Sequence, residues 1–145
     1  MPLTVNILTM AGQIFTGSAD EVTATAQEDG QFGILPGHAP LISLLDIGSL
    51  HIKRQSHEDL IFIGGGFLEV FNDTITVLAN EAEHAENIDE AKAEEARRRA
   101  QIDKENATED IDIAIFQAEI ERSAGRLRVA EMYRVRSRRR VSSDD

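Results

Sequence analysis

The chain has 145 residues, of which 28% are charged and 41% hydrophobic, with no Cys, no Trp and a formal net charge of -11. The hydrophobic fraction excludes a disordered polyelectrolyte, and the length excludes a single large enzyme fold. The lack of cysteine excludes disulfides, thiolate zinc sites and thiol nucleophiles, which argues against a small secreted scaffold. The acidic charge argues against a nucleic-acid partner, because phosphates are held by clustered Lys and Arg.

The amino terminus and the apolar segments predict neither a targeting segment nor a membrane span. The longest apolar stretch, 61–70, is interrupted by three glycines and a Glu, well short of the roughly 20 residues that a span requires. The first residues, Met1-Pro2-Leu3, begin neither a basic nor a long apolar region. We therefore expect no signal or transit peptide and an intracellular protein.

Charge and turn residues divide the chain into two parts. Residues 1–84 hold 11 acids and two bases, a net charge of -9, and residues 85–145 hold the other 15 acids and 13 bases, a net charge of -2. All three prolines and nine of the ten glycines lie before residue 67. A turn-rich part followed by a turn-poor part predicts two domains, 1–84 and 85–145.

The first part has the period of β-strands. Apolar and polar residues alternate over 3–7, 49–53 and 74–78, which predicts half-buried strands. Turn residues at 11–12, 28–30, 35–37 and 71–73 break the apolar runs. Short strands without an intervening helix predict an antiparallel β-sandwich or barrel. The run Gly64-Gly65-Gly66 predicts a bulge or a close backbone approach within the sheet.

The second part predicts two helices. Asn87 and Glu90 have the spacing of a capping box, and the residues through Asn106 are helix formers whose apolar face is mostly alanine. Cap and turn residues at 106–110 interrupt this helix. The second helix places apolar residues on one face at Ile113, Phe116, Ile120, Ala124 and Leu127. We expect an antiparallel helical hairpin with a thin core, only marginally stable by itself and able to leave its docking site, and hence an α+β fold.

No motif predicts catalysis or a metal site. The four histidines have no metal-binding spacing, and no Gly-x-Ser-x-Gly elbow is present. Gly64-Gly65-Gly66 is followed by Phe67, where a phosphate loop requires Lys and then Ser or Thr. We therefore expect a protein that is not an enzyme.

Two arginine-rich features have both a functional and a plainer interpretation. Arg122 and Arg126 share one helix face and could bind phosphates together with Lys92 and Asp89, although composition alone favours a solvated charged face. Residues 134–140 hold five arginines. This tail could contact nucleic acid, anionic lipid or an acidic protein, or it could be a frayed solvated helix end. Among partners, an acidic protein is favoured because the rest of the chain would repel polyanions.

Three sequence motifs resemble those of a known family. The first is the run from Glu28 to Leu41, which contains Gln31-Phe32-Gly33-Ile34-Leu35-Pro36-Gly37-His38. The second is the pair of segments 65–70 and 75–79. The third is Arg126-Leu127-Arg128-Val129-Ala130-Glu131. In order and spacing they resemble the epsilon subunit of bacterial F-type ATP synthases. The resemblance covers nearly the whole chain and implies a sandwich followed by a two-helix hairpin.

The resemblance also implies a function and partners. It implies a non-catalytic rotor subunit whose sandwich binds the gamma subunit and rests on the c-ring, peripheral to the cytoplasmic face of the cell membrane and attached only through partner subunits. The c-ring side would include Gln31, Phe32, Gly33 and His38. The hairpin would be compact, or extended into the catalytic head of alpha and beta subunits, where it blocks ATP hydrolysis. Arg122, Arg126 and Arg128 would contact that head.

Some relatives bind ATP in the compact hairpin through a motif Ile-Asp-x-x-Arg-Ala. Here the motif reads Ile88-Asp89-Glu90-Ala91-Lys92-Ala93, and a corresponding site would comprise Glu83, Asp89, Lys92, Arg99, Arg122 and Arg126. Lys92 lacks the planar fork of arginine, so the resemblance implies no required cofactor and at most weak regulatory ATP binding. Two alternative functions are a freestanding ATP sensor and an acidic adaptor with a basic tail.

Overall fold

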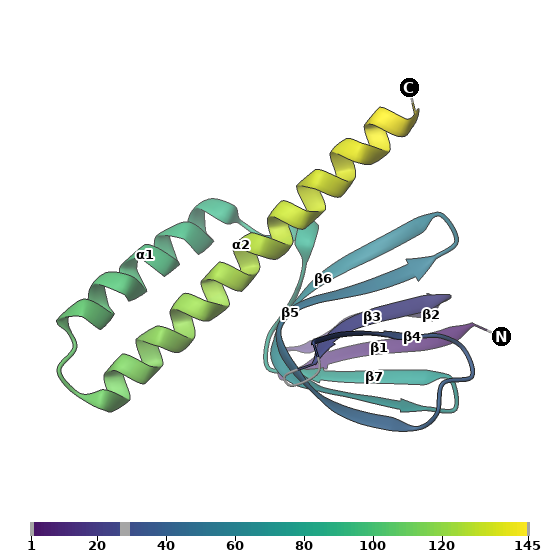
Figure 1. Ribbon diagram of the computed structural model, residues 1–145, viewed down its shortest axis with the longest axis horizontal. Helices are drawn as coiled ribbons and strands as arrows, with labels where there is room; N and C mark the ends of the chain where they lie inside the picture. Colours follow the sequence, from purple (N-terminus) through teal and green to yellow (C-terminus); the bar gives the residue numbers. More distant parts are fainter. Residues whose placement is uncertain (1, 27–29, 145) are drawn as a thin grey trace. The chain divides into compact units, whose positions relative to one another are not determined.

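The computed structural model describes residues 2–26 and 30–144 and divides the chain into two compact units, Met1–His84 and Ala85–Asp145. The first unit contains the strands and the second the helices (Figure 1). The strands are β1 (Leu3–Thr9), β2 (Gly12–Ala19), β3 (Glu21–Ala26), β4 (Gly30–Ile34), β5 (Leu41–Arg54), β6 (His57–Phe71), β7 (Thr74–Ala79) and β8 (Ala82–His84). The helices are the 3₁₀ turn η1 (Ala85–Asn87), α1 (Glu90–Asn106) and α2 (Asp110–Asp144).

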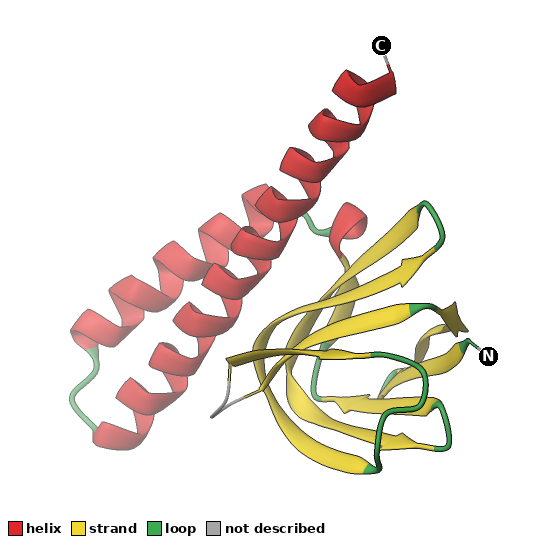
Figure 2. Ribbon diagram, turned by 45° about the vertical axis from the view of Figure 1, so that its right-hand side comes forward, coloured by secondary structure: helices red, strands yellow, loops and turns green. Residues whose placement is uncertain are grey.

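The strands form one hydrogen-bonded sheet that folds over on itself into two layers (Figure 2). The strand order is β2-β1-β7-β6-β5-β3-β4, and β8 pairs with β6. This confirms the predicted β-sandwich followed by two helices. The pairing of β1 with β7 is parallel, and the other strand pairs are antiparallel. β1 and β7 are distant in sequence, and no hairpin turn constrains their relative direction.

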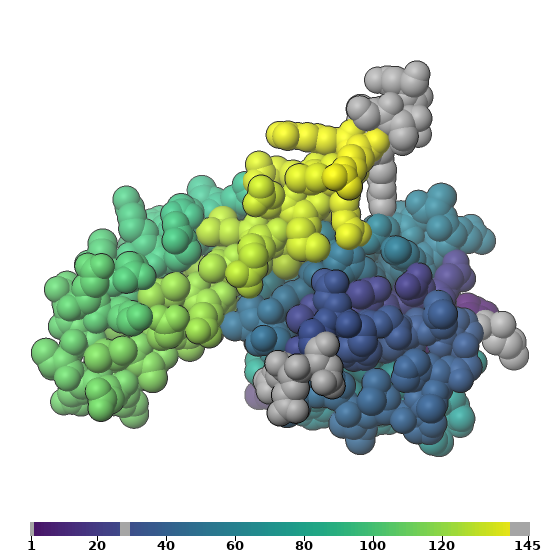
Figure 3. Space-filling view, in the orientation of Figure 1, coloured from purple at the N-terminus to yellow at the C-terminus, as the bar shows by residue number. Residues whose placement is uncertain are grey.

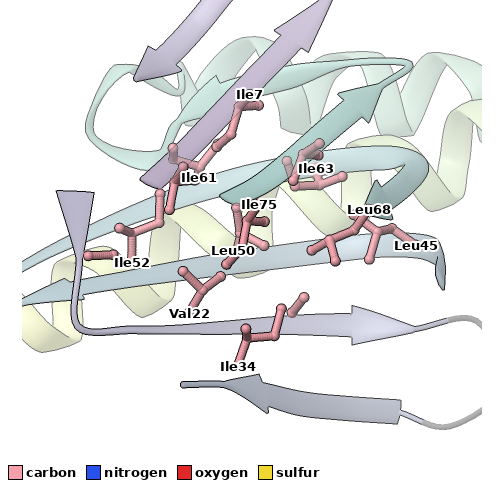
Figure 4. Close-up of a cluster of buried hydrophobic side chains, with 14 of the residues drawn as sticks. Ile7, Val22, Ile34, Leu45, Leu50, Ile52, Ile61, Ile63, Leu68 and Ile75 are labelled. Carbon is pink, nitrogen blue, oxygen red and sulfur yellow. The ribbon is translucent and has the colours of Figure 1, made fainter. Parts of the chain in front are cut away.

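The core lies between the two layers and follows the alternation in the sequence. Leu3, Val5 and Ile7 of β1 are fully buried, and Ile75 and Val77 of β7 lie beside them. Figure 4 shows side chains from the two layers meeting in this cluster. Successive strand residues point to opposite faces, so one row per strand fills the interior.

The glycine run in β6 makes the predicted close backbone approach. Gly65 and Gly66 have φ angles of +89° and +144°, and the β5–β6 register is the same on both sides of Gly65, with Leu45 paired to Gly66 and Ile47 to Gly64. A Cβ at Gly66 would lie 2.2 Å from the Leu78 carbonyl oxygen. Only glycine allows β7 to pair here at normal spacing.

The turns predicted at 35–37 and 71–73 are present, and the one predicted at 28–30 lies partly outside the described residues. Asn72 and Asp73 both have positive φ, at 49° and 61°, as the two central residues of a type I′ hairpin require. Gly37 has φ +86° and donates its N–H to Asp73 Oδ1 at 2.8 Å. The loop after β4 is thereby joined to the β6–β7 turn.

The first long helix begins later than its capping pattern predicts. Asp89 is the N-cap and accepts the Lys92 N–H at 3.1 Å, whereas Asn87 lies in the 3₁₀ turn η1. The prediction of Asn87 as cap is therefore wrong, because the chain from 85 makes one tight turn before α1. Ala107 ends α1 with extended backbone, as the break at 106–110 predicts.

The hairpin has the thin core that its alanine content predicts. Ala93 and Ala100 are the residues of α1 that are buried. The predicted apolar face of α2 is half-buried along its length, including Phe116 and Ile120. Lys104 Nζ donates to Gln117 Oε1 at 2.7 Å, which ties the end of α1 to α2.

Candidate partner-binding surfaces

The outer face of the sandwich carries a row of apolar side chains across four strands. Leu44 of β5 pairs with Phe67 of β6, Phe67 with Leu78 of β7, and Leu78 with Leu8 of β1. Leu44, Phe67 and Leu78 are 59%, 44% and 43% exposed. Paired residues in a sheet point to the same face, so these four side chains form one stripe, here called the apolar row.

Polar side chains border the apolar row. Two residues away on the same face, Glu69 pairs with Thr76, and Thr76 with Asn6, whose Oδ1 accepts a bond from Thr16 Oγ1 at 2.8 Å. Ile42, which pairs with Glu69, continues the apolar surface on β5 and is 75% exposed. An apolar centre with a polar rim is typical of a protein–protein interface.

Sequence reasoning missed the apolar row. Its only local signals are apolar residues at consecutive positions, as in Leu44-Leu45 and Phe67-Leu68, which leave one apolar side chain on each face of the strand. Such pairs also occur in strands buried on both faces. The strand register, which brings Leu8 and Leu78 beside Phe67, comes from tertiary structure.

The residues expected on the c-ring side lie along β4 and the loop after it. Gln31 and Gly33 are exposed on one face of β4, whereas Phe32 points the other way and packs against the core. His38 follows β4; it donates its N–H to Leu35 O at 3.2 Å, and its Nδ1 lies 2.8 Å from Ala39 O. Gln31 and Gly33 therefore form an exposed edge, and Phe32 contributes to packing.

The residues of the expected ATP site are distributed over both units. Glu83 lies on β8, in the sandwich unit. In the helical unit Asp89 is occupied as the cap of α1, and Lys92 is exposed one turn later. Arg99 pairs with Glu95 at 3.1 Å.

Hairpin register sets two members of the expected ATP site, Arg99 and Arg122, at a similar level along the two helices. The pairs Lys104–Gln117 and Arg134–Glu90 fix α1 antiparallel to α2 and bring Arg99 level with the turn of α2 that begins at Arg122. Arg126 lies one turn further on the same face of α2, and Arg122 is ion-paired with Glu119. Arg128 is exposed. Lys92 is about 10 Å from Arg99 along α1, at 1.5 Å per residue.

A chain of polar side chains joins Ser49, His51 and Glu58 in the sandwich unit: Ser49 Oγ lies 2.9 Å from His51 Nε2, and His51 Nδ1 lies 3.0 Å from Glu58 Oε1. Within 2–26 and 30–144 no group of three His, Asp or Glu side chains could hold a metal ion. No buried side-chain N or O atom there lacks a hydrogen-bond partner. The pKa of Arg97 is raised by its hydrogen bond to Glu94 and by the charge of that carboxylate. Arg97 therefore remains a cation at neutral pH. No described helix is long and apolar enough to cross a membrane.

Family models match nearly the whole chain. Residues 2–85 match the β-sandwich domain of the ATP synthase delta/epsilon chain, and residues 86–131 match its long α-helix domain. The chain belongs to the ATP synthase delta/epsilon family. The two matched regions are consecutive and meet between residues 85 and 86. Residues 132–145 lie beyond both.

Solved structures share the fold of this delta/epsilon family member. One comes from the mitochondrial ATP synthase of Euglena gracilis (OSCP, F1 and c-ring), with 21% identity, 86% of this chain and 78% of that chain covered, and a TM-score of 0.73. Another comes from the central stalk and c-ring of the Tetrahymena thermophila mitochondrial ATP synthase, with 13% identity, 90% and 97% coverage, and a TM-score of 0.60. At these identities the likeness establishes the fold.

Proposed function

We propose that this chain is a non-catalytic central-stalk subunit of a proton-translocating F-type ATP synthase, joining the gamma subunit to the c-ring. The observation that carries the proposal is the apolar row on the outer face of the sandwich in a member of the delta/epsilon family. Its polar rim and its position on a rigid sheet suit a permanent partner within a larger assembly. The gamma subunit is the partner that we assign to the apolar row.

Substitution of Phe67 tests this assignment. Phe67 lies in the middle of the apolar row, and burial of its ring is worth about 2 kcal/mol, so Phe67→Ser should weaken binding to purified gamma about thirtyfold. Leu35→Ser is the matched control, because Leu35 is 58% exposed in the loop after β4, outside the apolar row. Calorimetry measures the affinity of both variants for gamma. Equal affinity of Phe67→Ser and the native chain would refute the gamma assignment.

We assign the exposed edge of β4 to the c-ring contact. Gln31 presents an uncharged amide on this edge, with Gly33 beside it on the same face. A Gln31→Cys variant should form a disulfide with cysteines placed in the polar loops of the c subunits in the assembled enzyme. A His38→Cys variant serves as comparison from the loop beyond β4. Cross-linking from neither position would remove the c-ring assignment.

The helical hairpin is the element that we assign to inhibition of ATP hydrolysis. Its internal contacts rest on alanines, and Ile102, Ile111 and Ile115 are exposed at its tip. A hairpin that buries little apolar area can exchange one set of contacts for another at small cost. Arg122, Arg126 and Arg128 would then contact acidic surfaces of the alpha and beta subunits.

Truncation tests the hairpin's role. Hydrolysis by a core of alpha, beta and gamma subunits should fall when the full chain is added and recover with a chain that ends at Glu86. The shorter chain keeps the apolar row and should still bind. Equal hydrolysis rates with the two chains would remove the inhibitory role and leave the stalk assignment standing.

Weak regulatory binding of ATP by the hairpin is a further part of the proposal. Arg99 and Arg122 supply cations at one level of the hairpin, and Arg126 supplies another one turn further along α2. The ion pairs of Arg99 and Arg122 are partly exposed, so phosphates can displace those carboxylates cheaply. Calorimetry at millimolar ATP should detect binding that Arg126→Gln abolishes and Arg97→Gln preserves. High ATP affinity without gamma binding would instead favour a freestanding ATP sensor.

The proposed location follows from the proposed partners. We place the chain at the cytoplasmic face of the cell membrane as a peripheral subunit held by gamma and the c-ring. Fractionation should find it on membranes that contain the assembled synthase. A generic acidic adaptor with a basic tail would instead dissociate with added salt and show no fixed stoichiometry.

A further inference from the structure

The end of α2 extends beyond the rest of the helical hairpin. α2 has 35 residues and α1 has 17. Tyr133 Oη lies 3.4 Å from Glu86 Oε2, and Arg134 Nε lies 2.9 Å from Glu90 Oε1, at the start of α1. Figure 2 shows α2 continuing past this start of α1. We call residues 132–144 the helix extension; it lies outside the region that matches the family's helix domain.

The helix extension is a local reversal of the chain's charge. Its five basic residues are all arginines, at 134, 136, 138, 139 and 140, whereas residues 1–131 have a net charge of -14. Arg138 and Arg139 are exposed and form no ion pair or hydrogen bond with another described residue. In Figure 3 some yellow side chains of α2, before the grey part, project outward.

Like charges are concentrated in the helix extension, which indicates an anionic partner. Arg134 and Arg138 are four residues apart, a spacing at which like charges destabilise a helix, and the ion pair of Arg134 with Glu90 offsets part of this repulsion. The last acid before them is Glu131, and the next after them is Asp144. An anionic surface would remove this repulsion and stabilise the helix extension.

Helix length removes the objection that the acidic part of the chain would repel a polyanion. The 13 residues of the helix extension span about 20 Å at 1.5 Å per residue, whereas the Debye length at physiological salt is about 8 Å. Its end can therefore meet an anionic surface while charges before Glu131 are largely screened.

We propose that the helix extension binds the phosphate groups of an anionic lipid membrane directly. Arginine forms two parallel hydrogen bonds to a phosphate, and the helix extension contains arginine to the exclusion of lysine. Its arginines are spread around the helix and leave no continuous apolar face, so binding takes place at the headgroups without insertion. This contact is separate from the gamma and c-ring contacts proposed above.

Vesicle binding by the full-length chain tests the proposal. The probe is vesicles of equimolar phosphatidylglycerol and phosphatidylcholine, compared with phosphatidylcholine alone. The test variant is Arg138→Gln and Arg139→Gln together. The matched control carries the same two changes at Arg97 and Arg98 of α1, which have the same total charge and adjacent spacing and lie outside the proposed ATP site.

The native chain and the α1 control should bind the anionic vesicles and not phosphatidylcholine alone. Each basic residue near an anionic surface contributes about a factor of five, so the test variant should bind about 25-fold more weakly. Circular dichroism checks its helix content, and a chain ending at Glu131 is a second variant with the same expected loss.

Three results would overturn the proposal. The first is no binding of the native chain to anionic vesicles at low salt, and the second is an equal loss in the α1 control. The third is binding to poly-glutamate, but not to vesicles, with dependence on the same arginines, which would assign the helix extension to an acidic protein surface. Each result leaves the gamma assignment unaffected, because Phe67 and the vesicles are tested separately.

Discussion

Replacing Gly66 by alanine tests the close approach of β6 and β7. The new Cβ would lie 2.2 Å from the Leu78 carbonyl oxygen and 2.8 Å from the Ala79 Cα, at a φ of +144°. The positive φ costs an L-residue about 1–2 kcal/mol, and the overlap forces a backbone shift worth about 1–3 kcal/mol. We expect the free energy of unfolding of the sandwich to fall by about 2–5 kcal/mol, a large part of the 5–15 kcal/mol typical of a domain.

Gly12 provides a control that separates these two causes. Its φ is +130°, and a Cβ there would meet nothing within 4 Å. Gly12→Ala therefore carries the backbone strain without the overlap, and its expected loss is about 1–2 kcal/mol.

Urea titration of the two full-length variants, followed by the NMR amide signals of the sandwich, measures both losses. The single Tyr lies in α2 and Trp is absent, so fluorescence would not follow the sandwich. If Gly66→Ala and Gly12→Ala lost the same free energy, the overlap with Leu78 would not determine the glycine at 66.

Three further substitutions test local geometry. Asp89→Ala removes the cap of α1 and should reduce the protection of its first amides from hydrogen exchange by about 1 kcal/mol. Asn87→Ala should change this protection little. A larger loss of protection with Asn87→Ala than with Asp89→Ala would show that Asn87 is the cap. Ala100→Leu should overfill the contact between the helices and lower the thermal stability of the hairpin by about 1–3 kcal/mol, and Gln101→Leu on the exposed side should not. Gln55 has φ 55°, a left-handed conformation that glycine adopts without strain. Gln55→Gly should therefore stabilise the sandwich against urea by about 0.5–1 kcal/mol. A decrease in the free energy of unfolding would show that the backbone at Gln55 is unstrained.

Local sequence signals were sufficient to predict where the chain forms strands and where it forms helices. Alternation at 3–7 and 74–78 predicts β1 and β7 because side-chain burial has period two in a strand. The alanine-rich stretch through Asn106 and the break at 106–110 predict α1 and the start of α2 for equally local reasons. The family motifs identify the chain because they combine such signals in a fixed order.

The residue that caps the start of α1 was harder to predict, although capping is also a local feature. Asn87 and Asp89 are both good caps, and the choice depends on where the chain leaves β8 and whether it first makes a 3₁₀ turn. That geometry follows from the pairing of β8 with β6, which the residues around Asp89 do not encode.

The candidate surfaces needed tertiary structure. The sequence determined that Leu44, Phe67 and Leu78 lie in strands, and that arginines gather near the carboxyl end. Only strand register brought Leu8, Leu44, Phe67 and Leu78 into one row, because contacts between distant strands are set by the packing of the whole sandwich. Likewise, only the position where α1 begins against α2 decided that the arginines after Arg134 extend past the hairpin. Periodicity is encoded residue by residue, whereas the neighbours of a surface side chain depend on how separate elements pack.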